Sequence, residues 1–176
     1  AASTPAASTP AEDTSVVFEG NIIDGYISGA TVCLDLNNNF LCDTDEPSAL
    51  SGSGGSYKFT YDGTIPAGTQ ILADIPIGAV DEDLGTVEKA YNMLAPSENP
   101  VVVTPLTTLV SQEILNSGNE LTPEQAEEAV KVTLGFSEST SLLDNDFVAT
   151  EDSTLQTAAE VIAVALAVTK DTLENN

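Results

Sequence analysis

A change of sequence pattern at Pro105 most constrains the fold of this chain. Before it, short segments rich in β-branched and aromatic residues alternate with clusters of Gly, Ser, Asp and Pro, which is typical of strands joined by turns. After it, apolar residues recur at helical spacing. The sequence therefore predicts an α+β protein, with strands in residues 15–104 and helices in residues 105–176.

The density of expected strands in residues 15–104 indicates the kind of sheet structure. Many short strands separated by turns favour a β-sandwich of immunoglobulin-like or transthyretin-like type. We expect strands at 15–23, 31–36, 56–62, 70–76 and 101–104, and a hairpin within 79–95 that turns near Leu84 and Gly85.

Three helices are expected after the strands, at 105–118, 122–136 and 153–173, and we expect them to form a small bundle. Thr104 and Thr122 each precede a Pro at the first helical position, a common helix start. The third helix is apolar around most of its circumference, so it is expected to be buried. Either the sheet and the other two helices cover it, or it needs partners beyond its own chain.

The N-terminal segment, residues 1–14, has a different composition. It contains the pentapeptide AASTP twice and almost no bulky apolar side chain, so we expect a flexible arm. This composition suits both a carrier of O-linked sugar and a spacer from a cell surface. The chain starts without Met and without a basic or apolar leader, which fits a leader already removed. We therefore expect an exported protein, located outside the cell or on its surface.

The charge balance excludes two classes of partner. The chain has 28 acidic residues against four basic ones, and its formal net charge is −24. Such a charge repels nucleic acid and anionic lipid, so neither is expected as a partner. The nearest candidate for a membrane span, residues 158–168, is too short, because a span needs roughly 20 residues. Most carboxylates fit a solvated acidic surface, and only clustered ones argue for a cation site.

One such cluster is the stretch DLNNNFLCDTDE at residues 35–46. A twelve-residue calcium loop takes oxygen ligands from positions 1, 3, 5, 7, 9 and 12. The residues at these positions are Asp35, Asn37, Asn39, Leu41 (through its carbonyl), Asp43 and Glu46. The pattern predicts a Ca²⁺ site, and the alternative is a polar turn in a very acidic protein. Position 6 is Phe40, where a calcium loop has Gly, and no helices flank the loop. A structural role is therefore expected rather than that of a calcium sensor.

The two cysteines, Cys33 and Cys42, are expected to form a disulfide. They are too few for a zinc site in a chain that has no His. A bridge would clamp the far arm of the calcium loop to its parent strand, and it would need an oxidising compartment. Two reduced, buried thiols are the alternative.

The calcium loop and its flanks resemble the B-type repeats of bacterial serine-aspartate surface adhesins and the related carboxypeptidase-regulatory-like domains. The resemblance covers roughly residues 18–62 and rests on GNIIDGYISGATVCLDLNNNFLCDTDEP, followed by SGSGGSYKF. It implies an extracellular β-sandwich used as a stalk, spacer or adhesive module. It also implies calcium binding by Asp35, Asn37, Asn39, Asp43 and Glu46, whereas Phe40 departs from the Gly of the family pattern.

Two further acidic clusters, Asp81–Asp83 and Asp144–Asp146, are candidates for a second cation. Clusters of this kind are more often solvated loops.

The residue inventory argues against an enzyme. The chain has no His, no phosphate-binding Gly-rich motif, no Trp and only four Tyr for stacking on sugar. We expect a non-enzymatic structural protein, a cell-surface or filament-forming subunit stabilised by calcium and the disulfide. The residues expected to mediate self-association are Val16, Val17, Phe18, Ile22, Val161, Ile162, Val164 and Leu166. The alternative is a surface adhesin or ligand-binding module, a monomer or stalk that binds a protein or glycan of a host or matrix.

Overall fold

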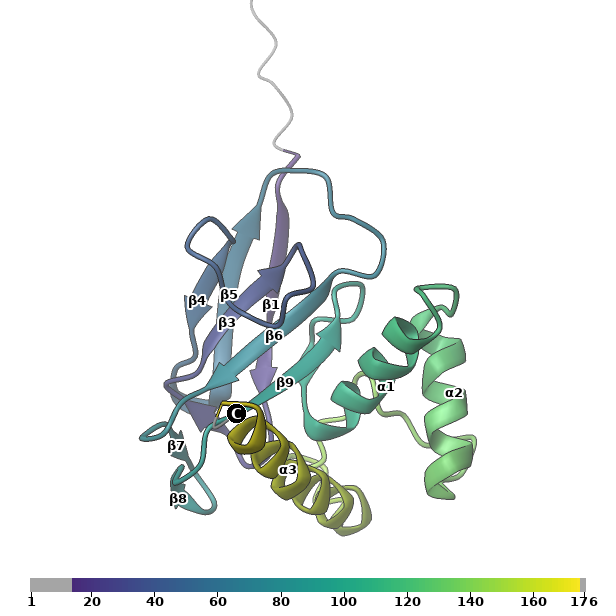
Figure 1. Ribbon diagram of the computed structural model, residues 1–176. Coiled ribbons are helices and arrows are strands. Elements are labelled where there is room, and N and C mark those ends of the chain that lie inside the picture. The colour runs from purple at the N-terminus through teal and green to yellow at the C-terminus, as the bar shows by residue number, and fades with distance from the viewer. Residues whose placement is uncertain (1–13, 175–176) are drawn as a thin grey trace, which may run out of the picture.

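The computed structural model describes residues 14–174, and the side-chain environments of residues 14–170. It shows an α+β protein in which antiparallel sheets are followed by three helices (Figure 1). This confirms the predicted fold class and the predicted order of strands and helices. The arm expected at residues 1–14 lies outside the described residues, except for Thr14.

Three sheets make up the strand-rich region. Their strand orders are β10-β1-β5, β4-β3-β6-β9 and, for the smallest, β2-β7-β8. β1 pairs with β5 in antiparallel and with β10 in parallel orientation. The strands are β1 (Val16–Ile22), β2 (Ile27–Ser28), β3 (Thr31–Asp35), β4 (Ser48–Leu50), β5 (Ser56–Tyr61), β6 (Gln70–Ile75), β7 (Val80–Asp81), β8 (Gly85–Thr86), β9 (Tyr91–Pro96) and β10 (Val102–Val103).

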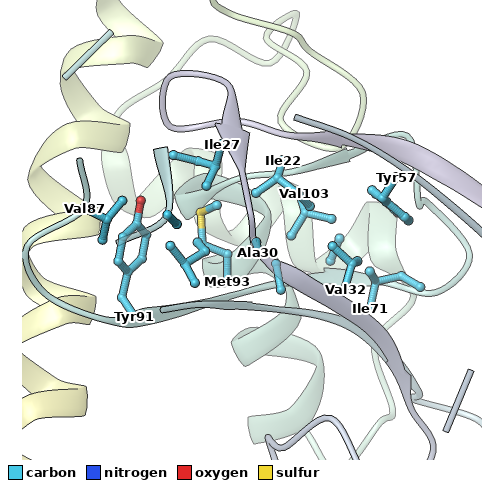
Figure 2. Packing of buried hydrophobic residues seen from close by; sticks show 14 of the residues in the cluster. Ile22, Ile27, Ala30, Val32, Tyr57, Ile71, Val87, Tyr91, Met93 and Val103 are labelled. Carbon is cyan, nitrogen blue, oxygen red and sulfur yellow. The ribbon is translucent and has the colours of Figure 1, made fainter. Parts of the chain in front are cut away.

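The two larger sheets share one hydrophobic core. Because successive side chains of a strand point to opposite faces, each strand contributes alternate residues to it. Phe18 of β1 stacks on Phe59 of β5 with ring centroids 5.4 Å apart. Figure 2 shows how Val32 and Ile71 of one sheet lie near Tyr57 of the other. This arrangement is the two-layer packing of a β-sandwich.

β1 lies between β5 and β10 in its sheet. β5 pairs with it from Val16 to Asn21, whereas the short β10 pairs with Asn21 and Ile22 at its end. The inward-facing Phe18 and Ile22 of β1 are buried in the core and cannot contact another molecule in this fold. Val16 and Val17 remain exposed. Of the self-association residues expected on this strand, only these two are therefore accessible.

The helices begin where the sequence predicts. α1 (Pro105–Asn116) starts after Thr104, whose hydroxyl oxygen accepts hydrogen bonds from two backbone amides of the first turn. α2 (Pro123–Leu134) starts after Thr122, which forms a capping box with Gln125. α2 ends at Gly135 in the left-handed conformation, with φ of 74°.

α3 (Ser153–Glu174) and α1 are integrated with the sheet rather than separate from it. α1 packs against β9 and contacts both α2 and α3 (Figure 1). Ala163 and Ala167 of α3 belong to the core of the sandwich. The three helices also share a second hydrophobic cluster, to which Ile23 and Val102 of the strand-rich region contribute, so the helical region packs on the sheets rather than standing apart from them.

The outer face of α3 is exposed. Val161 and Val164 retain 68% and 66% of their accessible surface, whereas Ile162 and Leu166 pack against the two larger cores. Among the described residues, the sheet and the other two helices do not cover this helix on every side, so that alternative is wrong. None of the described helices combines the length and apolar character that crossing a membrane requires.

Candidate metal centre

The predicted calcium loop connects two neighbouring strands. Asp35 is the last residue of β3, and Glu46 lies two residues before the start of β4. β3 and β4 pair in antiparallel orientation with Cys33 opposite Ser48. The sheet therefore holds positions 1 and 12 of the loop at its two feet. Both side chains are buried, with Asp35 0% and Glu46 8% exposed.

These two carboxylates organise the loop backbone. The oxygens of Asp35 accept hydrogen bonds from the amides of Asn39 at 3.1 Å and Phe40 at 2.9 Å. The oxygens of Glu46 accept from the amides of Leu36 at 2.7 Å and Asp43 at 3.2 Å. Because each carboxylate reaches backbone several residues away, the loop closes around its first and last ligand positions.

The side chains at positions 3, 5 and 9 meet at one point. The amide nitrogens of Asn37 and Asn39 both donate to Oδ2 of Asp43, at 2.9 and 2.8 Å. Asn39 Oδ1 also accepts from the amide of Leu41 at 2.8 Å. Three of the predicted ligand side chains are thus brought together.

Position 6 adopts the backbone conformation of a calcium loop although it is not Gly. Phe40 has φ of 62°, in the left-handed region. This conformation destabilises a residue with a Cβ by roughly 1 to 2 kcal/mol. The hydrogen bond from its amide to Asp35 compensates, as does the bond of 3.2 Å that its carbonyl accepts from Nδ2 of Asn92. The departure from Gly therefore changes the side chain and not the turn.

The predicted disulfide is present. Cys33 and Cys42 are bonded, with their Cα atoms 5.6 Å apart, which rules out the alternative of two thiols. The bridge packs against Leu72 and Leu94 of the sheet and Leu115 of α1. It ties position 8 of the loop to β3, as expected.

The donor atoms fit a hard cation. Three carboxylates, two amide oxygens and the Leu41 carbonyl are oxygen ligands of the kind that Ca²⁺ prefers. Among residues 14–170, however, no group of three or more His, Cys, Asp or Glu side chains is arranged to hold a metal ion. The site therefore depends on its asparagines. For Asn37 and Asn39 to present oxygens to an ion beside Asp43, their side-chain amides must turn and release the hydrogen bonds that their Oδ1 atoms accept from the amides of Asn39 and Leu41.

The two other acidic clusters hold local structure together. Asp81 is buried, and its carboxylate accepts from the amides of Gly25, Asp83 and Leu84. Asp144 accepts a hydrogen bond from the hydroxyl of Ser141.

Asp146 accepts from the Tyr26 hydroxyl at 2.8 Å and from the amide of Ala149 at 2.8 Å. Burial, together with this hydrogen bond and the negative charge of Asp146, raises the pKa of Tyr26 to about 12. The described contacts of both clusters are thus hydrogen bonds within turns, together with longer-range bonds from Tyr26 to Asp146, from Gly25 to Asp81 and from Gly54 to Glu82.

A second functional candidate was missed by sequence reasoning. Asp24 is buried although it stands in the turn-like sequence DGY, and it accepts a hydrogen bond of 3.0 Å from the hydroxyl of Tyr91. The two residues are 67 positions apart. No local pattern links them, so only the fold reveals the pair.

Comparison of the chain with protein-family models, with curated proteins and with solved structures found no match. The resemblance to calcium-binding B-type repeats therefore stays a prediction from the sequence.

Proposed function

We propose that this protein is a non-enzymatic extracellular structural module, a cell-surface or filament-forming subunit, stabilised by Ca²⁺ bound in the loop at residues 35–46. One observation carries the proposal: Phe40 adopts φ of 62° at position 6 while buried Asp35 accepts its amide hydrogen bond. A polar turn in an acidic protein does not require a strained residue at this position of the ligand series.

The role of the ion would be to hold the loop, and with it the β3-β4 edge of the sandwich. Loop residues 35–46 contain three carboxylates at ligand positions and no Lys or Arg. A divalent cation would relieve the repulsion among them. Because the unfolded chain lacks the site, binding adds ~2.7 kcal/mol of stability when free Ca²⁺ is a hundred times its dissociation constant.

The extracellular location is supported by the disulfide, because such bonds persist in oxidising compartments. The finer fold assignment, an immunoglobulin-like or transthyretin-like sandwich, belongs to the same proposal. It is supported by two sheets packed on one core and by the resemblance to extracellular sandwich domains.

The proposed self-association needs apolar side chains that are accessible on the surface. The exposed Val161 and Val164 on α3 and the exposed Val16 and Val17 at the start of β1 are the accessible apolar candidates. Burying apolar surface between copies would offset the repulsion between chains of charge −24, and divalent cations would screen that repulsion.

A ligand-binding or adhesive module is the second candidate. The observation that favours it is a cavity of about 440 Å³ next to α3.

Calorimetry tests the calcium site. Ca²⁺ titrated into EDTA-treated protein is expected to give a binding isotherm and to raise the melting temperature. Glu46→Gln is expected to abolish both effects, because Glu46 supplies position 12 of the loop. Asp45→Asn, the exposed neighbour at a position that carries no ligand, is the matched control and should bind normally. A melting temperature that EDTA leaves unchanged in the wild type would refute the calcium claim.

Sedimentation velocity and electron microscopy with Ca²⁺ test the subunit role. Oligomers or filaments are expected from the wild type, and Val161→Asp should weaken them because it places a charge on the exposed face of α3. Dispersed monomers at high protein concentration with Ca²⁺ would overturn the subunit role and leave the calcium site standing.

A further inference from the structure

A cavity of about 440 Å³ lies between the β7-β8 hairpin and α3. Leu84, Val87, Ala163, Val164 and Ala167 contribute apolar side chains to its wall. Its volume falls within the roughly 300 to 1,000 Å³ typical of small-molecule sites. None of the predicted calcium ligands lines this cavity.

Asp24 gives this apolar cavity a polar end. The side chain is 7% exposed and lines the cavity together with Tyr91. Its Oδ2 accepts the Tyr91 hydroxyl hydrogen bond, whereas Oδ1 is buried and has no hydrogen-bond partner among the described residues. A buried carboxylate oxygen without a donor is unfavourable, and a ligand that supplies the donor removes this penalty.

The charges around Asp24 select the kind of donor. Asp81 and Glu88 also line the cavity, Glu160 lies near enough to act on Asp24, and Lys89 is the one positive residue of the lining. The negative groups outnumber the positive one, on a chain of net charge −24. The field at this end of the cavity therefore favours a cation that carries N–H groups.

We propose that this cavity binds a small protonated primary amine, whose ammonium group donates a hydrogen bond to Oδ1 of Asp24 and whose apolar body contacts α3 and Leu84. A primary ammonium group suits the position better than a quaternary one, because the acceptor is covered and a quaternary nitrogen has no hydrogen to donate. The inference is independent of the calcium loop.

Titration calorimetry at pH 7.5 with four six-carbon probes tests the proposal. The probes are hexylammonium, hexan-1-ol, hexanoate and hexyltrimethylammonium, which share an apolar body and differ in the head group. Hexylammonium is expected to bind at least about tenfold more tightly than each of the others, in line with a hydrogen bond between charged groups. Equal binding of hexylammonium and hexan-1-ol, or no binding of hexylammonium, would overturn the proposal.

Two variants locate the site. Asp24→Asn keeps the shape of the side chain and an acceptor for Tyr91 but removes the charge, so it should weaken hexylammonium binding about tenfold or more. Val164→Trp, at an exposed position of the wall, should weaken binding by filling the cavity. Glu120→Gln, an exposed acid far from the lining, is the control for overall charge and should bind as the wild type does.

The pH dependence gives a readout in the unmodified protein. Burial raises the pKa of Asp24 to about 6, against the lowering effect of the Tyr91 hydrogen bond and with contributions from Asp81 and Glu160. Hexylammonium binding should therefore weaken about tenfold between pH 7.5 and pH 5, as Asp24 gains a proton. Glu88 and Lys89 also line the cavity. Any pH dependence of binding that persists in Asp24→Asn comes from groups such as these and not from Asp24. If Asp24→Asn shows the same pH dependence as the wild type, Asp24 is not the acceptor.

Discussion

Removal of the Cys33–Cys42 bridge should destabilise the protein by about 3 to 4 kcal/mol. The bonded residues are 9 positions apart, and a loop of this size gives about 2.6 kcal/mol in the chain-entropy account of disulfide stabilisation. Cys33 is also fully buried against Leu72 and Leu94. Replacing its sulfur with hydrogen in a Cys33→Ala, Cys42→Ala double variant leaves a small cavity, which adds roughly 1 kcal/mol.

Guanidinium unfolding, read by circular dichroism in EDTA, measures this difference without the contribution of calcium. The double variant should show a lower midpoint with an unchanged native spectrum, and a melting temperature lower by roughly 7 to 14 °C for a chain of this size. Reducing the wild-type bridge without substitution removes the cross-link and keeps both sulfurs, so it should account for most of the loss. A total loss below about 1 kcal/mol would show that the loop is held by its hydrogen bonds alone and would refute this reasoning.

Three further predictions concern the stability of the fold. In urea unfolding, Thr104→Ala should destabilise the protein by about 1 to 2 kcal/mol, which is more than the effect of Thr122→Ala. The reason is that the Thr104 cap is fully buried whereas Thr122 is exposed. Equal losses of stability in the two variants would contradict this. Lys170→Met removes a salt bridge of 2.7 Å to Asp74 between side chains that are 21% and 44% exposed, so it should destabilise the protein by only about 0.5 to 1 kcal/mol. It should also speed amide hydrogen exchange in the last turns of α3. Unchanged exchange there would count against the contact. Asp24→Asn should stabilise the protein at pH 7.5 by at most roughly 3 kcal/mol, and much less at pH 4. The reason is that the pKa of Asp24 rises from 3.8 to about 6 on folding, so the native state loses stability as pH rises through this range. An equal effect at both pH values would rule out titration of Asp24 as the cause.

Local signals in the sequence predicted the elements well. Thr104 and Thr122 mark the starts of α1 and α2 because the cap and the Pro act within one turn of helix. The spacing of Asp35 and Glu46 predicted positions 1 and 12 of a calcium loop, and in the structure these residues lie at the two ends of the loop between β3 and β4. Phe40 stands where a calcium loop has Gly, yet it adopts positive φ. Its amide donates a hydrogen bond to Asp35, and its carbonyl accepts one from Asn92.

The sequence by itself determined the α+β class, the positions of the three helices and of the longer strands, and the partners of the disulfide, but not the short strands β2 and β4. These follow from residues close together in the chain, where propensity, capping and loop length act directly. The tertiary structure alone decided that β1 is an inner strand with Phe18 and Ile22 buried, and that one face of α3 stays exposed. It also brought Asp24 to Tyr91 across 67 positions. Burial and long-range pairing depend on which elements pack together, and the side-chain pattern of one segment does not contain that information.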